Sequence, residues 1–337
     1  MISIVICTYN RSESLKRTLA SLAGMSCSRD LCSEIIVVDN NSKDRTRDVV
    51  EDFARTSPFH VRYVFEATTG LAHARNRGVA AASGQVVAFI DDDVLVSHNW
   101  LTEVKKGFDQ YHAVCVGGKV LLSAELRKPA WWNKSYDLVL GGFDLGDSVI
   151  VGDRSGPELV GIGANLSVRR LAFSKHGLFR IDLGRSGKRL LMGEEYEFAK
   201  RLREKGEVAV YCPSALVYHC PAMERISRQY VRRWFYRFGE WSFVRALESP
   251  RREITIFGVP RWRYRSALED FYKSVVLCLR RQSAQALFHE IQLVFFLGYF
   301  CGSLKRFLHL GSLAQPSADG CSAPVLGLEE DRSSPAK

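Results

Sequence analysis

Three consecutive aspartates follow an uncharged apolar run in the segment VVAFIDDDVLV. The run, residues 86–90, has the β-branched and aromatic composition of a strand buried on both faces. Like charges at Asp91, Asp92 and Asp93 repel one another unless a cation, a helix N-terminus or water compensates them. A solvated loop that caps a helix near Ser97 would account for one aspartate and poorly for three. The segment therefore favours a metal site at the carboxyl end of a strand, where open α/β folds place their ligands.

Polar side chains also follow the first two strands that the sequence predicts. The strand Ile2–Cys7 is followed by TYNR, and the strand Glu34–Val38 by DNNSKDRT. For Asp39 alone, a turn-forming Asp-Asn pair is the ordinary alternative. Because the carboxyl ends of parallel strands share one edge of a sheet, three such ends together favour ligand contact. The side chains that follow the first strand are Thr8, Tyr9, Asn10 and Arg11.

The elements that position these residues alternate between strand and helix up to residue 110. This βαβ spacing predicts the α/β class, with a doubly wound, mostly parallel sheet. Further strands are expected at Val61–Phe65 and Gln85–Ile90, with helices at Ser12–Leu22, Lys43–Arg55 and Leu71–Ala82. Later in the chain, strands are expected at Ala113–Val116, within Leu159–Val168 and at Val208–Tyr211, with a charged amphipathic helix at Glu194–Lys205.

Length and charge predict one large domain with a basic helical extension. The chain has 337 residues, 46% of them hydrophobic, and a net charge of +10. Between Pro221 and Arg265 stand eleven arginines, no lysine and four glutamates, a net charge of +7 that favours an anionic partner. We therefore divide the chain into a catalytic domain at 1–220, a helical basic and apolar region at 221–310, and a tail at 311–337 whose composition predicts disorder.

Cysteine usage and apolar patterning bear on the compartment. The nine cysteines are scattered without a CxxC pair, as in reduced cytosolic proteins. The start MISIVICTYN has no basic n-region and reads as a strand, so we expect no signal peptide. The longest uncharged apolar stretch, Ile291–Leu304, has 14 residues, short of the roughly 20 that span a bilayer. We expect an interfacial or buried helix there, in a cytoplasmic protein peripheral to the cytoplasmic membrane face.

Five segments stand in order along the chain: SIVICTYNR, IIVVDNNSKDRT, GLAHARNRG, FIDDDV and GEEYEF. Together they resemble the family-2 inverting glycosyltransferases, which have the GT-A fold, and the resemblance runs from Ser3 to about Gly239. It implies a nucleotide-sugar donor, with a UDP-sugar expected, lying across the strand ends. It also implies a saccharide or lipid-linked saccharide acceptor in surface polysaccharide or glycolipid synthesis. No GxGxxG follows the first strand, which counts against a dinucleotide cofactor.

The resemblance implies roles for the donor-side residues. Asp39 would bond the nucleotide base, and the segment Thr8–Arg11 would line the nucleotide pocket. The motif ARN places Arg75 and Asn76 beside uracil and the phosphates, and a guanidinium fork suits phosphate. A single helix arginine is more often a surface charge. Asn165 in GANLSVRR matches a family position near the transferred sugar.

The same resemblance gives the aspartates a DxD pattern. Asp93 would hold a divalent metal, Asp91 would contact the ribose or metal-bound water, and Asp92 would touch the donor. A hard cation on carboxylate oxygens neutralises a diphosphate leaving group, and both Mg²⁺ and Mn²⁺ fit these ligands. His219 falls where some GT-A enzymes carry a histidine ligand to the metal, although a lone histidine is more often structural.

An inverting transfer needs a general base that takes the proton of the acceptor hydroxyl. The family places an acidic pair at the start of a helix with the second member as base, which lands on Glu195; this chain has Glu-Glu where the family often has Glu-Asp. Glu194 is the second candidate and Glu197 the third. The alternative is helix stabilisation, since acids favour any first turn and Glu197 has i,i+4 spacing to Arg201.

Two aromatic segments lie outside these motifs. Trp131 and Trp132 in AWWN would suit stacking on a sugar face, although adjacent tryptophans more often serve packing. The segment RISRQYVRRWFYRFG combines arginines with Trp234 and Phe238 at helical spacing. Such a helix suits an anionic membrane surface, and a lid over a diphosphate would need the same chemistry.

Two other functions use part of this pattern. A nucleotidyltransferase also uses a nucleotide, a metal and a doubly wound sheet, but it would want a glycine-rich phosphate loop where this chain has CTYNRSES. A non-enzymatic basic module that binds membrane or nucleic acid explains the arginines and leaves the acidic strand ends unexplained. We therefore expect no nucleic-acid partner.

Overall fold

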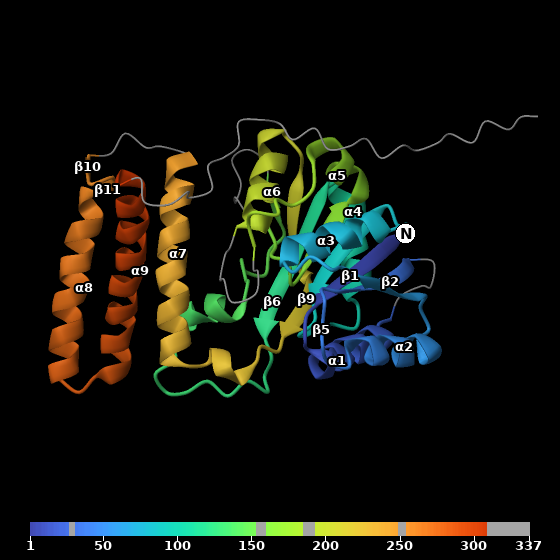
Figure 1. The fold of residues 1–337 in the computed structure, drawn as a ribbon, viewed down its shortest axis with the longest axis horizontal. Coiled ribbons are helices and arrows are strands. Elements are labelled where there is room, and N and C mark those ends of the chain that lie inside the picture. Colours follow the sequence, from blue (N-terminus) through green and yellow to red (C-terminus); the bar gives the residue numbers. More distant parts are fainter. Residues whose placement is uncertain (27–30, 153–159, 185–192, 249–253, 309–337) are drawn as a thin grey trace, which may run out of the picture.

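The computed structural model describes residues 1–26, 31–152, 160–184, 193–248 and 254–308, and Figure 1 shows their arrangement. A wound sheet with helices on both sides forms the larger part. Three long helices stand beside it at one end of the molecule. The disorder predicted for 311–337 concerns residues outside those described.

A parallel half-sheet forms the N-terminal part, as the sequence predicts. Its strands are β1 (Ile2–Thr8), β2 (Cys32–Asp39), β3 (Val61–Phe65) and β4 (Val86–Asp91), and the helices between them are α1 (Ser12–Ala23), α2 (Thr46–Thr56) and α3 (Leu71–Ala81). The strands lie in the order β3-β2-β1-β4 and are all parallel. Their register sets Thr8 beside Asp39 and Cys7 beside Asp91, so the polar strand ends share one edge.

The second half of the sheet is mixed. Its elements are β5 (Val94–Val96), α4 (Trp100–Tyr111), β6 (Cys115–Leu122), the 3₁₀ helix η1 (Lys134–Leu140), β7 (Ile150–Gly152), β8 (Leu166–Arg169), α5 (Arg170–His176), α6 (Glu194–Glu204), β9 (Ala209–His219) and the 3₁₀ helix η2 (Met223–Arg225). The full order is β3-β2-β1-β4-β8-β6-β9-β5, with β7 also on β9. β8 is antiparallel to both of its neighbours, whereas β6 and β9 are parallel. The sheet is thus mostly parallel, as expected.

Several boundaries in this half differ from the prediction. Only the end of the predicted range 159–168 forms a strand, and residue 159 lies outside the described part. β6 runs well beyond Val116, because the pair Gly117-Gly118 interrupts the apolar pattern without ending the strand. Glycine is needed there, since a Cβ on Gly117 would lie 2.0 Å from the carbonyl oxygen of Val160. β9 likewise extends to His219, which brings that side chain to the site edge.

Alternating side chains of the sheet supply two apolar layers, since successive strand residues point to opposite faces. Ile4 and Ile6 of β1 join one layer with Leu19, and this layer contains α1, α2 and α4. Val5 joins the other layer with Phe198, and that layer contains α3, α5 and α6. Helices therefore cover both faces and leave the strand ends accessible.

The C-terminal region consists of α7 (Arg228–Glu248), β10 (Thr255–Ile256), β11 (Val259–Pro260), α8 (Arg261–Leu279) and α9 (Ser283–Phe307). The three helices stand side by side, with α7 nearest the sheet and α9 between α7 and α8 (Figure 1). A Cβ on Gly298 of α9 would lie 1.9 Å from the carbonyl oxygen of Tyr236, so glycine permits this close helix packing.

The apolar stretch Ile291–Leu304 lies within α9, a helix that extends beyond this uncharged stretch at both ends. α9 has 25 residues and a mean hydropathy of 1.4 in its most apolar window, which is enough by length and composition to cross a membrane. A core helix of a soluble protein passes the same test. α9 packs against both neighbouring helices, and 33% of that window is buried.

Candidate active site

A cavity of about 500 Å³ lies at the carboxyl ends of β1 and β4. It brings together most of the predicted site residues, which come from both halves of the sheet and from α3 and α6. Those that line it are Thr8, Tyr9, Arg11, Arg75, Asp91, Asp92, Asp93, Glu194, Glu195 and His219. Asn10, Asp39, Asn76 and Asn165 are not among the described residues that line it.

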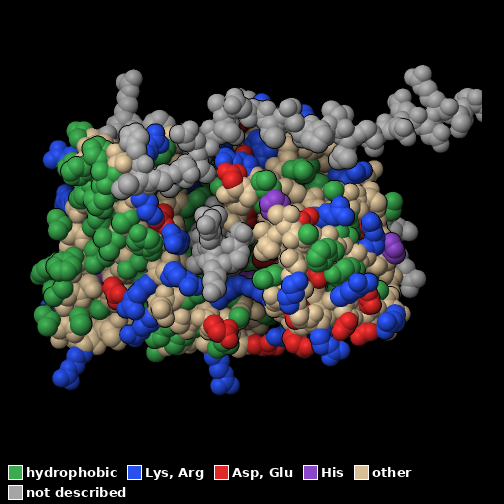
Figure 2. Space-filling view, in the orientation of Figure 1, with side chains coloured by type: hydrophobic (Ala, Val, Ile, Leu, Met, Phe, Trp, Pro, Cys, Tyr) green, Lys and Arg blue, Asp and Glu red, His purple; other side chains and the backbone are tan. Residues whose placement is uncertain are grey.

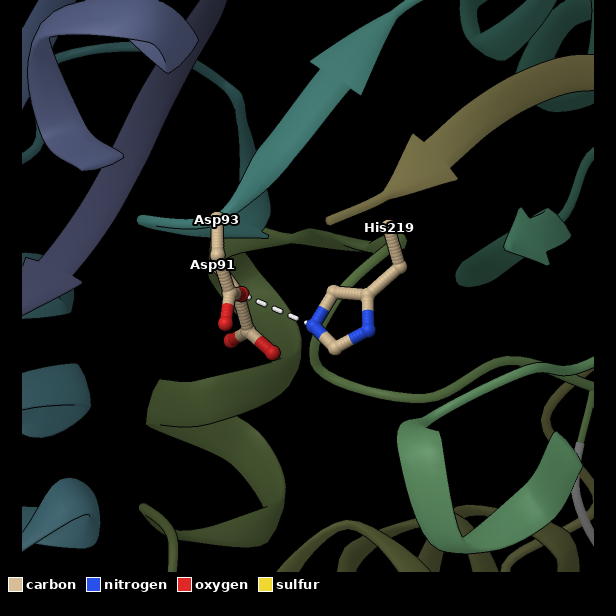
Figure 3. A group of neighbouring side chains, drawn as sticks. All are labelled: Asp91, Asp93 and His219. Carbon is tan, nitrogen blue, oxygen red and sulfur yellow. Dashed lines mark hydrogen bonds and ion pairs between the residues drawn. The ribbon is translucent and has the colours of Figure 1, made fainter. Parts of the chain in front are cut away.

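Asp91, Asp93 and His219 form a group that could hold a metal ion. Each offers a ligand atom, and these atoms all lie within 4.8 Å of one another (Figure 3). His219 Nε2 lies 2.8 Å from Asp93 Oδ1, and its Nδ1 lies 2.5 Å from the carbonyl oxygen of Leu140. A metal-binding histidine usually has its other ring nitrogen held by a carbonyl or carboxylate in this way. The residues present therefore fit a hard or borderline divalent cation.

The charges of Asp93, His219 and Arg11 shift the pKa values of the two proposed ligands among them. Burial raises the pKa of Asp93, but the charge and hydrogen bond of His219, together with Arg11, outweigh it and hold the pKa well below its usual range. Burial likewise lowers the pKa of His219, and the charge of Asp93 outweighs it and raises that pKa. The pair thus stabilises the charged form of both partners.

Both carboxylate oxygens of Asp92 accept hydrogen bonds within the protein. Thr8 Oγ1 donates to its Oδ2 at 2.8 Å, and Arg11 Nη1 donates to its Oδ1 at 2.9 Å. Arg11 also contacts Asp93 at 3.1 Å. Burial, opposed mainly by Arg11, raises the pKa of Asp92 to about 6. Asp92 also lines the cavity, so its expected contact with the donor stays a prediction.

The three aspartates now have separate explanations. Asp91 and Asp93 belong to the possible metal group, whereas Asp92 anchors the loop after β1. A solvated loop does not describe them, since Asp92 and Asp93 are buried. Arg11, expected as a pocket residue, supplies the compensating charge.

Asp39 stands next to the cavity-lining residue Asn40 and is hydrogen-bonded to its own surroundings. It accepts hydrogen bonds from the Ser42 backbone N–H at 2.8 Å and from Tyr63 Oη at 2.7 Å. Burial and the Asp39 hydrogen bond raise the pKa of Tyr63 to about 12. The next residue, Asn40, lines the cavity instead, with its Oδ1 accepting from the Gly70 N–H. Sequence reasoning missed Asn40, although its position directly after Asp39 was a signal.

Three predicted asparagines connect the surrounding elements instead. Asn76 accepts from the Phe179 N–H at 3.0 Å and donates to the Phe179 carbonyl at 2.8 Å. Asn165 is buried, accepts from Trp100 Nε1 at 2.9 Å and donates to two backbone carbonyls. Asn10 accepts from a backbone N–H in the loop after β2. These amides connect the elements around the site, and the contacts expected between them and the donor stay predictions.

Arg75 is buried beneath the acidic side of the cavity. Its Nη1 lies 2.9 Å from Glu194 Oε1, its Nη2 lies 3.0 Å from Glu195 Oε1, and Nη2 is 4.0 Å from Asp91. Burial lowers the pKa of Arg75, but the two glutamates outweigh it and raise that pKa. The guanidinium fork expected for phosphate is therefore occupied by two carboxylates, and Arg75 is no ordinary surface charge.

The two glutamates at the start of α6 differ in access. The Glu194 side chain is 4% exposed and the Glu195 side chain 21% exposed. Glu195 Oε1 also accepts from the Gly163 N–H at 3.1 Å, while its Oε2 has no partner in the described part of the chain. Glu197 pairs with Arg201 at 2.8 Å, as the i,i+4 alternative predicted. Of the two glutamates that line the cavity, Glu195 is thus the more accessible.

The C-terminal region supplies one wall of the cavity. Arg225 of η2 and Tyr230 and Trp234 of α7 line it, a position that suits the lid given above as the alternative for this segment. Trp234 also joins an aromatic cluster with Tyr136 and Ile291. The aromatic side of α7 is therefore packed inside the molecule, which corrects its expected exposure to a membrane.

Comparison with known proteins agrees with this architecture. Glycosyl transferase family 2 matches residues 3–177. The succinoglycan biosynthesis protein ExoM of Rhizobium meliloti is 30% identical over 240 residues, which cover 71% of this chain and 73% of that protein. A glucosyl-dolichyl phosphate glucuronosyltransferase of Haloferax volcanii is 28% identical over 222 residues, covering 65% and 68%.

Solved structures share the fold at low sequence identity. The mannosyltransferase PcManGT from Pyrobaculum calidifontis, in complex with GDP-Man and Mn²⁺, matches with a TM-score of 0.56 and 18% identity, covering 93% of this chain and 76% of that one. Staphylococcus aureus TarS 1–349 in complex with UDP-GlcNAc matches with a TM-score of 0.53 and 14% identity, covering 91% and 92%. The sheet with its helical C-terminal part is thus of the GT-A type, and the family match confirms the predicted resemblance. The chain is a glycosyltransferase and belongs to glycosyl transferase family 2.

Proposed function

We propose that the chain transfers a sugar, with inversion, from a nucleotide-sugar donor to a hydroxyl of a saccharide or lipid-linked saccharide acceptor. The observation that carries this proposal is one cavity that combines the Asp91, Asp93 and His219 group with the accessible carboxylate of Glu195. A UDP-sugar remains the expected donor, and Mg²⁺ or Mn²⁺ the expected metal. Support comes from relatives named for succinoglycan biosynthesis and for a dolichyl phosphate substrate, and from neighbours bound to GDP-Man or UDP-GlcNAc.

Glu195 is the proposed general base. Arg75 and the Gly163 N–H hold its Oε1, which orients the carboxylate and leaves Oε2 to accept the proton of the attacking hydroxyl. Glu194, buried against Arg75, positions that guanidinium. The base is thus fixed by contacts from α3 and from the loop before β8.

The donor side lies across the ends of β1, β4 and β9. Asp91, Asp93 and His219 would hold the divalent cation, which when bound neutralises the charge of the diphosphate leaving group. Arg225 lines the same cavity and adds a positive charge for that diphosphate. Tyr9 and Asn40 line it beside the loops that Asp39 organises, and we place the nucleotide base there.

A thermal-shift experiment with nucleotides tests the donor site. A ligand that binds only the folded state raises the melting temperature. We expect UDP, more than GDP, CMP or ADP, to stabilise the protein when Mn²⁺ or Mg²⁺ is present and to lose that effect in excess chelator. Stabilisation by none of these nucleotides would contradict the assignment of the cavity.

We also propose that residues 1–220 form the catalytic domain and that the helical region 221–310 holds it at an anionic membrane surface on the cytoplasmic side. The apolar face that fits this role lies on α8, not on α7. Five of its side chains, at spacing i, i+3, i+4, i+7 and i+11, are each between 43% and 80% exposed: Leu268, Phe271, Tyr272, Val275 and Leu279. Figure 2 shows hydrophobic side chains gathered over this helical end of the molecule.

Basic residues at both ends of α8 favour lipid over a second copy of the chain as the occupant of this face. Arg261 and Arg265 lie exposed at its start, and Arg280 and Arg281 follow its end. An apolar stripe with arginines beside it suits the boundary between anionic headgroups and acyl chains, where apolar burial and charge attraction act together.

Liposome flotation tests the membrane proposal. Leu268→Glu and Tyr272→Glu place charges on the α8 stripe and should abolish binding to anionic vesicles. Leu171→Glu, at an exposed leucine of α5, is the matched control and should bind like the unaltered protein. High salt should weaken binding without eliminating it, because apolar burial is not screened. A concentration-dependent dimer lost in the α8 variants, without vesicle binding, would assign the stripe to a second copy and overturn the lipid proposal.

A further inference from the structure

A second cavity of about 230 Å³ lies outside the active site, between the loop before η1 and the turn that joins α8 to α9. The loop contributes Trp131, Trp132 and Asn133 to its lining. The helices contribute Leu277, Ala284, Gln285, Phe288 and His289. Its volume is below the range of roughly 300–1,000 Å³ typical of pockets for drug-sized ligands, so it suits a single ring-sized unit.

The tryptophan pair in this cavity is held rigidly. Trp132 Nε1 donates to Asp137 at 2.8 Å, and the ring centroids of Trp131 and Trp132 are 5.5 Å apart. The guanidinium of Arg228 lies 5.6 Å from the Trp131 ring centroid. Packing thus fixes both rings, yet both still line the cavity. A fixed aromatic surface can bury an apolar C–H face of a pyranose at low entropic cost.

Polar groups without partners stand around these rings. The Trp131 indole N–H, the Asn133 side-chain N–H₂ and the Gln285 amide make no hydrogen bond within the described part of the chain. His289 Nδ1 lies 2.7 Å from Asp270 Oδ1, and since a carboxylate only accepts, Nδ1 donates and Nε2 stays available. Donors and acceptors beside aromatic rings match the hydroxyl pattern of a sugar better than an acyl chain.

One aromatic cluster and one chain segment contribute residues to both cavities. Trp131 and Trp132 pack on the aromatic cluster that contains Trp234, and Trp234 lines the active-site cavity from the other side. The segment that begins at Trp131 continues through η1 to Leu138, which also lines the active-site cavity. The short segment 131–138 thus contributes lining residues to both cavities.

We propose that the second cavity binds an inner sugar residue of the acceptor glycan, an inference that rests on the transfer function proposed above. The class of ligand is a neutral pyranose with an apolar face. Contact with an inner sugar, away from the reacting hydroxyl, would let the enzyme select acceptors by the identity of that inner sugar.

Nuclear magnetic resonance of the ¹⁵N-labelled indole groups tests this inference. The six tryptophans give few signals, and Trp131→Phe and Trp132→Phe assign the two in the cavity. Glucose, galactose, cellobiose and lactose are the probes. We expect at least one to shift the Trp131 and Trp132 signals and to leave the signal of Trp262 unchanged. Trp262 lies on α8 about 22 Å along the helix from Leu277, at 1.5 Å per residue.

Substitutions separate a binding role from a packing role. Trp131→Ala removes an aromatic anchor and should weaken sugar binding by about tenfold or more. Gln285→Ala, at an exposed residue, should weaken it without affecting folding. Trp262→Phe is the matched control and should change nothing. Nucleotide-dependent thermal shifts should be the same in all variants, so failure of this subsite is distinguishable from failure of the donor site.

Two results would overturn the inference. One is that no probe sugar shifts either cavity signal while the protein still responds to UDP and Mn²⁺. The other is that octyl β-glucoside shifts the signals whereas methyl β-glucoside does not, which would assign the cavity to an alkyl chain.

Discussion

Arg75 Nη2 lies 3.0 Å from Glu195 Oε1 and joins the parallel half of the sheet to the first turn of α6. The same guanidinium reaches Glu194 at 2.9 Å, so one buried cation organises both carboxylates. In the sequence, Arg75 stands more than a hundred positions before the two glutamates. Acidic residues at the start of a helix are common. Here the ion pair with Arg75 orients the Glu195 carboxylate in the cavity.

Glu195→Gln should slow transfer by roughly 10²–10⁴-fold, because the amide keeps the size of the side chain and cannot accept the proton. Donor affinity should persist, since Glu195 lies on the acceptor side of the proposed site. Single-turnover rates and nucleotide binding check the two parts separately. An active Glu195→Gln beside an inactive, folded Glu194→Gln would show that the base is Glu194.

Arg75→Lys should lower kcat while nucleotide binding is retained, because an ammonium is a point charge that cannot bridge two carboxylates as a planar fork does. Arg75→Met should cost about 3–5 kcal/mol of unfolding free energy, since it removes the buried cation that pairs with Glu194 and Glu195. Denaturant unfolding and initial rates measure these effects. Exposed Arg55, which pairs with Asp52, gives the control Arg55→Met. If Arg75→Met is as stable and active as the control, Arg75 does not position the base.

Glu34→Gln should destabilise the protein at neutral pH and not at low pH. Burial raises the pKa of Glu34, but hydrogen bonds from Ser83 and Arg62 outweigh it and lower the pKa from 4.5 to about 2. A lowered folded-state pKa contributes stability above the unfolded value, here roughly 3 kcal/mol, and that contribution is lost as pH falls from 4.5 to about 2.

Unfolding free energies measured at several pH values check this. Glu51→Gln removes one partner of an exposed glutamate–arginine pair and should cost at most about 0.5 kcal/mol. A constant difference between Glu34→Gln and the unaltered protein from pH 7 down to pH 3 would contradict the linkage.

The N-terminal half of the fold was predictable because its signals are local. β1, β2 and β4 contain short apolar runs that end in polar residues, and α1 has apolar residues at helical spacing. The mixed half was harder, since Gly117-Gly118 conceals the length of β6 and short strands such as β5 carry little periodicity. The antiparallel direction of β8 depends on long-range pairing that no local pattern encodes.

Side-chain roles at the site were less predictable than residue positions. The motifs brought Asp91, Asp93, His219 and Glu195 to one cavity, but no motif indicates which polar atoms already have partners. The Asn165 amide is hydrogen-bonded to Trp100 and to two backbone carbonyls. The guanidinium of Arg75 pairs with two glutamates. Such assignments depend on contacts between distant segments.

Release of the nucleotide from a panel of nucleotide sugars is the direct measurement of the proposed transfer. The panel contains UDP-, GDP-, TDP- and CMP-linked sugars, each assayed with Mn²⁺, with Mg²⁺ and with excess chelator. We expect turnover of at least one donor, dependent on the divalent cation. We also expect a loss of at least about a hundredfold in Asp93→Asn, and circular dichroism would establish that this variant is folded. Undiminished turnover in chelator or in folded Asp93→Asn, or no turnover of any donor, would contradict the proposed function.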